Sequence, residues 1–222
     1  MLRVIMNNNY FFVDGSALLG DIRRARKDLG IPTKARLDLR NFAQFFTGHK
    51  FTEFHQGAYR RFVFYFVQDD ERLRSHVELP DCTRPGEVSD LRIEYCGKRI
   101  RQFEEAKKWL EANMAPENVS ECLYRSEKAV DTQICCDALQ LAGTGKLDRL
   151  FLYTNDFDFV PLCRSLRLLG ANINLFRLLG EGVNRDLAAE CDALHEMDEA
   201  SIRACFVTPP NEAAASRAVV GG

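Results

Sequence analysis

Residues 150–176 have the pattern of a strand, a helix and a second strand in close succession. A short apolar run at 150–153 is followed by an amphipathic segment at 159–169, and a second apolar run lies at 172–176. A β-α-β unit of this kind joins two parallel strands, and parallel sheets are covered by helices on both faces. We therefore expect an α/β fold built around a mainly parallel central sheet.

The alternation of strands and helices continues through most of the chain. The pattern predicts strands at 10–13 and 62–67, and helices at 17–29, 37–46, 131–142 and 184–194. We expect these elements to form one three-layer, Rossmann-like domain over residues 1–200. Residues 201–222 end in a segment rich in Pro, Ala and Gly, and we expect this C-terminal extension to be largely disordered.

The composition is that of a soluble globular protein, with 46% apolar and 28% charged residues. No apolar run approaches the roughly 20 residues that span a bilayer, and the apolar start of the chain is too short for a secretory signal. The eight cysteines include no C-x-x-C pair, and none has a histidine at zinc-finger spacing. The sequence therefore predicts a cytoplasmic protein with reduced thiols, no membrane partner and no structural zinc.

Two acidic side chains follow the strand at 150–153. Asp156 and Asp158 are spaced i, i+2 at the point where this strand should end. Ligands of α/β sheets bind beyond the carboxyl ends of parallel strands, so we expect both acids to face an active-site crevice. An alternative for Asp158 is that it only caps the following helix, whose first turn tolerates Pro161. This alternative does not account for Asp156.

Two further acids occupy similar positions. Asp14 follows the first strand, and Asp131 begins a helix. Taken singly, Asp14 with Gly15 could form a turn, and Asp131 could be a helix N-cap. Parallel topology, however, brings all of these acids to one edge of the sheet. Asp137 lies about 120° away from Asp131 around the helix, so we exclude it from this group.

The group of acids predicts a metal site. Crowded carboxylates repel one another strongly unless a cation neutralises them. Oxygen ligands without a histidine or cysteine partner favour Mg²⁺ or Mn²⁺ over zinc. Such ions activate water and neutralise charge that develops on a phosphoryl group. Phosphodiester hydrolysis is therefore the reaction that this arrangement suits.

Three short blocks surround the acids. They are Val13-Asp14-Gly15-Ser16, Glu127-Lys128-Ala129-Val130-Asp131 and Thr154-Asn155-Asp156-Phe157-Asp158-Phe159-Val160-Pro161-Leu162. These blocks resemble the signature motifs of NYN domains, in the LabA-like group of the PIN-like nuclease superfamily. The segment 184–198 also resembles the final helix and strand of that family, so the resemblance covers residues 10–198.

The resemblance implies a PIN-like fold and a metal-dependent ribonuclease site. The residues that it assigns to catalysis and metal binding are Asp14, Asp131, Asp156 and Asp158. Of these, Asp158 would be either a fourth ligand or an acid that orients the others. The candidates for substrate binding within the three blocks are Ser16, Lys128 and Asn155. Lys128 would bind a phosphate as a point charge.

Positive charge for a nucleic acid has to come from local patches, because the formal net charge is only −2. Arg23 and Arg24 lie on the helix that follows Asp14, and we take them as candidates for binding single-stranded RNA. The alternative is that they form a solvated helix face. The strand residues that we expect in the core, rather than in base stacking, are Phe11, Phe12, Phe64 and Phe66.

The leading prediction is a divalent-metal-dependent ribonuclease that uses Mg²⁺ or Mn²⁺. The alternative is a catalytically weak PIN-like domain that binds RNA or a regulatory protein partner. The chain departs from the family pattern at Ala17, where Asn is frequent, and at Phe157, where Ser is frequent. Both departures favour the alternative. The sequence leaves open whether the chain forms a homo-oligomer.

Overall fold

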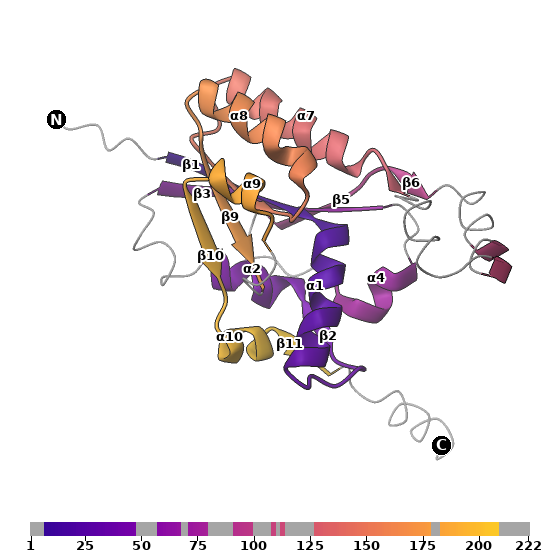
Figure 1. Cartoon of the computed structure of the whole chain (residues 1–222). Helices are drawn as coiled ribbons and strands as arrows, with labels where there is room; N and C mark the ends of the chain where they lie inside the picture. The colour runs from indigo at the N-terminus through magenta and orange to yellow at the C-terminus, as the bar shows by residue number, and fades with distance from the viewer. Residues whose placement is uncertain are drawn as a thin grey trace, which may run out of the picture.

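The computed structural model describes residues 7–47, 57–67, 71–79, 91–99, 108–109, 112–113, 127–178 and 183–208. These residues form a three-layer α/β domain, in which helices cover both faces of a central sheet (Figure 1). The expected fold class is confirmed. Among the described residues, no helix is both long and apolar enough to cross a membrane.

The central sheet has six strands in the order β10-β9-β8-β1-β3-β5, and every neighbouring pair is parallel. The strands are β1 (Asn7–Asp14), β3 (Gly57–Phe66), β5 (Leu91–Tyr95), β8 (Arg149–Tyr153), β9 (Asn172–Arg177) and β10 (Ala193–Glu196). β1 lies between β3 and β8, with Val13 beside both Phe64 and Tyr153. The residues that follow β1 and β8 therefore meet at one edge of the sheet.

Two layers of helices cover the sheet (Figure 1). α1 (Gly15–Asp28) and α2 (Leu39–Thr47) pack on one face, whereas α7 (Val130–Gly143) and α8 (Val160–Leu168) lie side by side on the other. Successive β1 side chains point to opposite faces, so Phe11 packs with α1 and α2, and Phe12 packs with α7 and α8. Both faces of the strands are apolar because both are covered.

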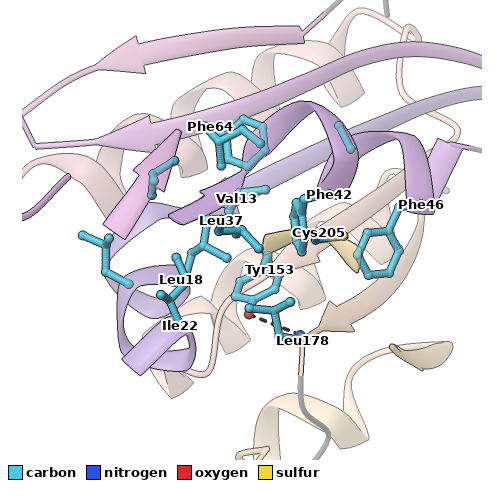
Figure 2. Close-up of a cluster of buried hydrophobic side chains, with 14 of the residues drawn as sticks. Val13, Leu18, Ile22, Leu37, Phe42, Phe46, Phe64, Tyr153, Leu178 and Cys205 are labelled. Atoms are coloured by element: carbon cyan, nitrogen blue, oxygen red, sulfur yellow. Dashed lines mark hydrogen bonds between the residues drawn. The ribbon is translucent and has the colours of Figure 1, made fainter. Parts of the chain in front are cut away.

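Aromatic side chains fill the core between the sheet and the α1–α2 layer. Phe11 stacks between Phe62 and Phe151, with ring centroids 4.9 and 4.3 Å apart. These three residues are in register on neighbouring strands, which aligns their rings. Figure 2 shows Phe42 and Phe46 of α2 in the same cluster. The strand phenylalanines that the sequence placed in the core are all buried, which confirms that prediction.

Shorter elements complete the described part of the chain. They are β2 (Arg36–Asp38), α4 (Glu71–His76), β4 (Val77–Glu78), β6 (Lys98–Arg99), β7 (Glu127–Lys128), the 3-10 helix η1 (Phe157–Phe159), α9 (Arg185–Ala189), α10 (Glu199–Ala204) and β11 (Phe206–Val207). β2 pairs with β4 and with β11, while β6 and β7 form an antiparallel pair.

Two of the expected helices are shorter than the sequence pattern indicated. The first residues of the segment 37–46 belong to β2, and α2 begins only at Leu39. Asp38 caps α2, because its carboxylate accepts hydrogen bonds from Arg40 N and Asn41 N at 2.8 and 3.1 Å. The pattern at 184–194 gives only α9, and the chain then returns to the sheet as β10. In both places, pairing with a neighbouring strand overrides the local helical pattern.

The folded domain continues beyond the boundary expected at residue 200. α10 ends at Ala204, and β11 pairs with β2. Ile202 and Cys205 are buried in the core, so apolar packing holds this segment in place (Figure 2 labels Cys205). The expectation of disorder from residue 201 is therefore wrong for residues 201–207, whereas residues 209–222 lie outside the described ranges.

Gly15, the first residue of α1, lies against the end of β3. A Cβ at this position would lie 2.3 Å from Phe66 Cδ1 and 2.5 Å from the carbonyl oxygen of Tyr65. Because that backbone oxygen is fixed in the sheet, we expect Gly15→Ala to lower the free energy of unfolding by about 1–3 kcal/mol in urea denaturation. Gly20→Ala, in the same helix and with nothing within 4 Å, should instead raise it by up to about 1 kcal/mol. Equal effects of the two substitutions would contradict a close contact between α1 and β3.

Candidate active site

Asp14 is the most buried of the acids expected in the site, with 3% of its surface exposed. It ends β1 and caps α1, because its Oδ1 accepts hydrogen bonds from Ser16 N and Ser16 Oγ at 2.9 and 2.8 Å and from Ala17 N at 3.4 Å. Its Oδ2 accepts a hydrogen bond from Thr154 Oγ1 at 3.2 Å. The carboxylate is thus held in one orientation by the start of α1 and the end of β8.

Burial is the main cause that raises the pKa of Asp14 above its ordinary value. The hydrogen bond from the Ser16 hydroxyl acts in the opposite direction, and the negative charge of Asp131 raises the pKa of Asp14 further. The two carboxylates therefore repel each other at the edge of the sheet. A cation between them would relieve this repulsion and the cost of burying charge.

Asp131 lies in the first turn of α7. Ala129, directly before the helix, has a left-handed backbone with a φ of 79° and gives α7 no side-chain cap. A left-handed conformation costs an alanine roughly 1–2 kcal/mol, and such strain is found where a functional site demands a particular backbone path. Val130 is buried and anchors the start of the helix. The strained turn and the buried Val130 together fix the position of Asp131 in the first turn of α7.

Asp156 and Asp158 occupy different positions at η1. Asp156 caps η1, because its Oδ1 accepts a hydrogen bond from Asp158 N at 3.0 Å, and its own N–H donates to Thr154 Oγ1 at 3.2 Å. Asp158 is exposed, and α8 begins without a side-chain cap. Asp156 is therefore the carboxylate that caps η1, and the alternative that Asp158 caps the following helix stays a prediction.

Thr154 connects two of the expected acids. Its hydroxyl donates to Asp14 Oδ2 and accepts from Asp156 N, so a short chain of hydrogen bonds joins the ends of β1 and β8. Thr154 is fully buried. It was not expected in the site, and its sequence signal is only its position directly after the apolar strand. The link fixes the Asp14 carboxylate relative to the backbone of Asp156.

A buried ion pair supports the same edge of the sheet. Arg177, at the end of β9, donates hydrogen bonds from Nε and Nη2 to Asp21 of α1 at 2.9 and 2.8 Å. Tyr153 Oη donates to Asp21 Oδ2 at 2.7 Å, and Arg177 Nη1 donates to the carbonyl oxygen of Thr154 at 3.4 Å. Leu178 N donates to Tyr153 Oη at 3.3 Å (Figure 2). The network joins α1, β8 and β9 beside Thr154.

The sequence contains a partial signal for this ion pair. Asp21 lies on the buried stripe of α1 with Leu18, Ile22 and Ala25, where a carboxylate is stable only with a partner. Arg177 ends an apolar strand, which is equally unusual for a charged residue. Each position indicates a buried charge. Neither identifies its partner, which lies 156 residues away in the chain.

The candidates for substrate binding in the three blocks neighbour the acids in sequence. Ser16 is exposed, and its hydroxyl donates to Asp14. Asn155 Oδ1 accepts a hydrogen bond from Asn184 N at 2.6 Å, which ties the loop after β8 to the start of α9. Lys128 lies in β7, two residues before α7 begins. Asn155 thus has a structural partner in addition to any contact with a substrate.

Arg23 and Arg24 are exposed on α1 but lie far from the acids. They follow Gly15 by eight and nine residues, which corresponds to about 12–14 Å along the helix axis. A substrate bound at Asp14 would have to extend over two helical turns to reach them. The structure therefore does not bring these arginines together with the acids.

Asp137 is engaged away from Asp131, as the helical spacing predicts. Its carboxylate accepts hydrogen bonds from Tyr65 Oη and Gln133 Nε2, both at 2.8 Å.

Cys96 follows β5 at the same edge of the sheet. Burial, and then the charges of neighbouring carboxylates, raise the pKa of Cys96 to about 11. In the metal-free protein its thiol is therefore protonated at neutral pH.

The carboxylates at this edge suit a hard cation that takes its remaining ligands from water and substrate. Within the described ranges, no group of three or more His, Cys, Asp or Glu side chains is arranged to hold a metal ion. Mg²⁺, however, is usually held by one or two carboxylates, with water and substrate phosphates as its remaining ligands. The coupled pair of Asp14 and Asp131 suits that mode of binding. A closed cage of four acids is not formed by the described side chains.

Comparisons with known proteins agree with this architecture. The family model for the NYN domain matches residues 12–198. A solved structure of a protein of unknown function from Vibrio parahaemolyticus RIMD 2210633 is similar in fold, with a TM-score of 0.50 and 14% identity, covering 89% of this chain and 97% of that chain. None of the curated proteins matches the chain significantly. The LabA-like subgroup stays a prediction. Because the family model spans most of the sequence, the chain belongs to the NYN domain family.

Proposed function

We propose that this protein is a divalent-metal-dependent ribonuclease, which hydrolyses RNA phosphodiester bonds at the edge of the sheet where β1 and β8 end. NYN domains are generally nucleases that act on RNA, and PIN-like nucleases typically use divalent metal ions. The observation that carries the proposal is the buried Asp14 carboxylate, whose pKa is raised by burial and by the charge of Asp131. Such a pair is unfavourable without a cation and favourable with one.

The residues at this edge have distinct roles in the proposed reaction. Asp14 and Asp131 would hold Mg²⁺ or Mn²⁺, which would supply a water of lowered pKa and neutralise charge on the phosphate. Asp156, whose position is fixed by Thr154 and by η1, would orient the attacking water. Asp158, on the exposed side of η1, would add a ligand or orient the others.

The remaining candidates would hold the substrate or keep the acids in position. Ser16 donates to Asp14 and would keep that carboxylate in position while the phosphate binds. Lys128, near the start of α7, would bind a phosphate as a point charge. Asn155 would contact the RNA from the loop after β8. Arg23 and Arg24 would bind only a longer RNA, because they lie more than two helical turns away.

The competing function is RNA or protein binding without efficient cleavage. The absence of a three-acid group among the described side chains supports this alternative. Ala17 and Phe157, which depart from the family pattern, support it as well. A preference for single-stranded RNA, a cytoplasmic location and a homo-oligomer or protein partner stay predictions. Cleavage and binding therefore have to be measured separately.

The test is cleavage of an end-labelled single-stranded RNA by the purified chain. We expect cleavage with Mg²⁺ or Mn²⁺, none in EDTA, and a loss of roughly 100-fold or more in Asp131→Asn, because one ligand of the ion is removed. Asp28→Asn is the control: it is an exposed carboxylate at the far end of α1, and it should cleave like the wild type.

Two other results would decide against the ribonuclease. Equal cleavage by the wild type and Asp131→Asn would indicate a contaminating nuclease. Binding of RNA that weakens as salt rises, without any cleavage, would favour the RNA-binding alternative. Neither result depends on knowing the natural RNA target.

A further inference from the structure

Phe157 is an exposed aromatic side chain between two of the site acids. It lies in η1, directly after Asp156 and before Asp158, and 61% of its surface is exposed. Most phenylalanines in the described part of the chain are buried, among them Phe159, two residues further on. The ring of Phe157 is thus exposed to solvent at the edge of the sheet where the acids lie.

The turn that carries Phe157 is held rigidly. Asp156 Oδ1 accepts from Asp158 N at 3.0 Å, and Phe159 N donates to the carbonyl oxygen of Asp156 at 3.2 Å. The buried ring of Phe159 anchors the turn in the core. Asn155 Oδ1 accepts a hydrogen bond from Asn184 N at 2.6 Å, which fixes the preceding loop. Because the backbone of this turn is already fixed, binding of a ligand to Phe157 would cost little conformational entropy.

Single exposed apolar residues are common on protein surfaces and need no function. Leu168, at the far end of α8, is such a residue, with 90% of its surface exposed. Phe157 differs from it in two respects. Its ring is planar and aromatic, and it is flanked by the carboxylates of Asp156 and Asp158, which repel phosphate groups. Apart from the phosphate that the metal ion would hold, contacts with RNA at this point therefore favour a base over the backbone.

We propose that Phe157 stacks on an unpaired nucleobase beside the scissile phosphate. The proposal rests on the function proposed above and adds the means by which the site selects single-stranded RNA. Every base offers a π-face, so stacking tolerates any sequence. A base in a duplex is already stacked on its neighbours and is not available to Phe157. The site would therefore prefer single strands with little base specificity.

The test compares the wild type, Phe157→Ala, Phe157→Tyr and Leu168→Ala. Binding of a labelled single-stranded RNA is measured by fluorescence anisotropy in EDTA, where no cleavage is expected, and KM is measured with Mg²⁺ or Mn²⁺. We expect Phe157→Ala to weaken binding and raise KM roughly 5- to 100-fold, which corresponds to the loss of one base stack. Phe157→Tyr and Leu168→Ala should stay within about twofold of the wild type, since the former keeps the aromatic ring and the latter lies away from the site.

RNA with one abasic position gives a sharper readout. When the missing base is the one that stacks on Phe157, the wild type and Phe157→Ala should bind this RNA equally, because the interaction is already absent. Duplex RNA of the same sequence should be insensitive to Phe157→Ala. Thermal melting of each variant confirms that the exposed substitution leaves the fold intact.

The possible results separate the two proposals. If the wild type cleaves RNA but Phe157→Ala matches it in both binding and KM, the stacking role is overturned and the ribonuclease stands. If Phe157→Ala weakens duplex and single-stranded RNA equally, the stacking role is also overturned. If the wild type neither binds nor cleaves RNA, both proposals fail together.

Discussion

Replacing Asp14 by Asn should lower the rate of metal-dependent RNA cleavage by roughly 1000-fold, a loss of several kcal/mol of transition-state stabilisation. The substitution removes one carboxylate of the coupled pair with Asp131. It keeps the shape of the side chain, and the Asn oxygen can still accept the hydrogen bond that Ser16 N donates to Asp14. Single-turnover cleavage at saturating Mn²⁺ measures the effect, with Asp28→Asn as the control for loss of an acid elsewhere on α1.

The same substitution should make the metal-free protein more stable at neutral pH. Burial and the charge of Asp131 raise the pKa of Asp14 in the folded state and outweigh the hydrogen bonds from Ser16 and Ala17, which lower it. The unfolded chain ionises Asp14 at its ordinary pKa, so the free energy of unfolding falls as pH rises from the ordinary pKa to the raised one, and it stays low above that window. Asp14→Asn has no proton to release. Its advantage over the wild type should therefore be absent at low pH and grow through the same window.

Urea denaturation in EDTA over a series of pH values measures this difference, and Mn²⁺ provides the complementary test. An ion at 100 times its dissociation constant stabilises the folded state by about 2.7 kcal/mol, and we expect this gain in the wild type but not in Asp14→Asn. Equal stabilisation of both proteins by Mn²⁺ would show that Asp14 is not a ligand. A less stable variant in EDTA would show that the hydrogen bonds of Asp14 outweigh its cost of burial.

The position of Asp14 could be predicted because it depends on rules that act within a short segment. An apolar run followed by an acid gives a strand and its end, and parallel topology then brings separate strand ends to one edge. The pairing of Val13 with Tyr153 realises this expectation directly. The same reasoning could not supply the distances between carboxylates, since these depend on side-chain rotamers and on the exact path of each loop. The cluster of four acids therefore stays a prediction, and the charge of Asp131 is the one carboxylate charge that raises the pKa of Asp14.

Errors in the sequence-based prediction occur where a distant partner decides the local structure. The segment 184–194 has a helical pattern, yet β10 forms because β9 offers an edge with which it can pair. The composition suggested a domain boundary before the segment 201–207, yet Ile202 and Cys205 are buried in the core. The exposure of Phe157 could likewise not be predicted, because it is a property of the folded surface and not of the neighbours of Phe157 in sequence.

The ion pair of Arg177 and Asp21 is another consequence of distant pairing, and Arg177→Met should lower the free energy of unfolding by about 3–5 kcal/mol. Only 1% of Arg177 and 2% of Asp21 is exposed, so the substitution leaves the Asp21 carboxylate buried without its cation. Tyr153 still donates to Asp21, but a single neutral donor does not compensate the charge. The loss of the Arg177 bond to the Thr154 carbonyl should also loosen the edge that holds Asp14.

Urea denaturation of three further variants, namely Asp21→Leu, the double variant and Arg203→Met, separates the pair from the packing around it. In Asp21→Leu/Arg177→Met both charges are removed, and we expect this protein to be more stable than either single variant, because no buried charge is left alone. Arg203→Met is the matched control, since Arg203 bonds Glu199 at 2.6 Å on the exposed face of α10; it should cost no more than about 0.5 kcal/mol. A loss in Arg177→Met as small as in Arg203→Met would show that water reaches the Asp21 carboxylate. A double variant as unstable as the sum of the two single variants would show that Arg177 and Asp21 contribute through their separate packing and not as a pair.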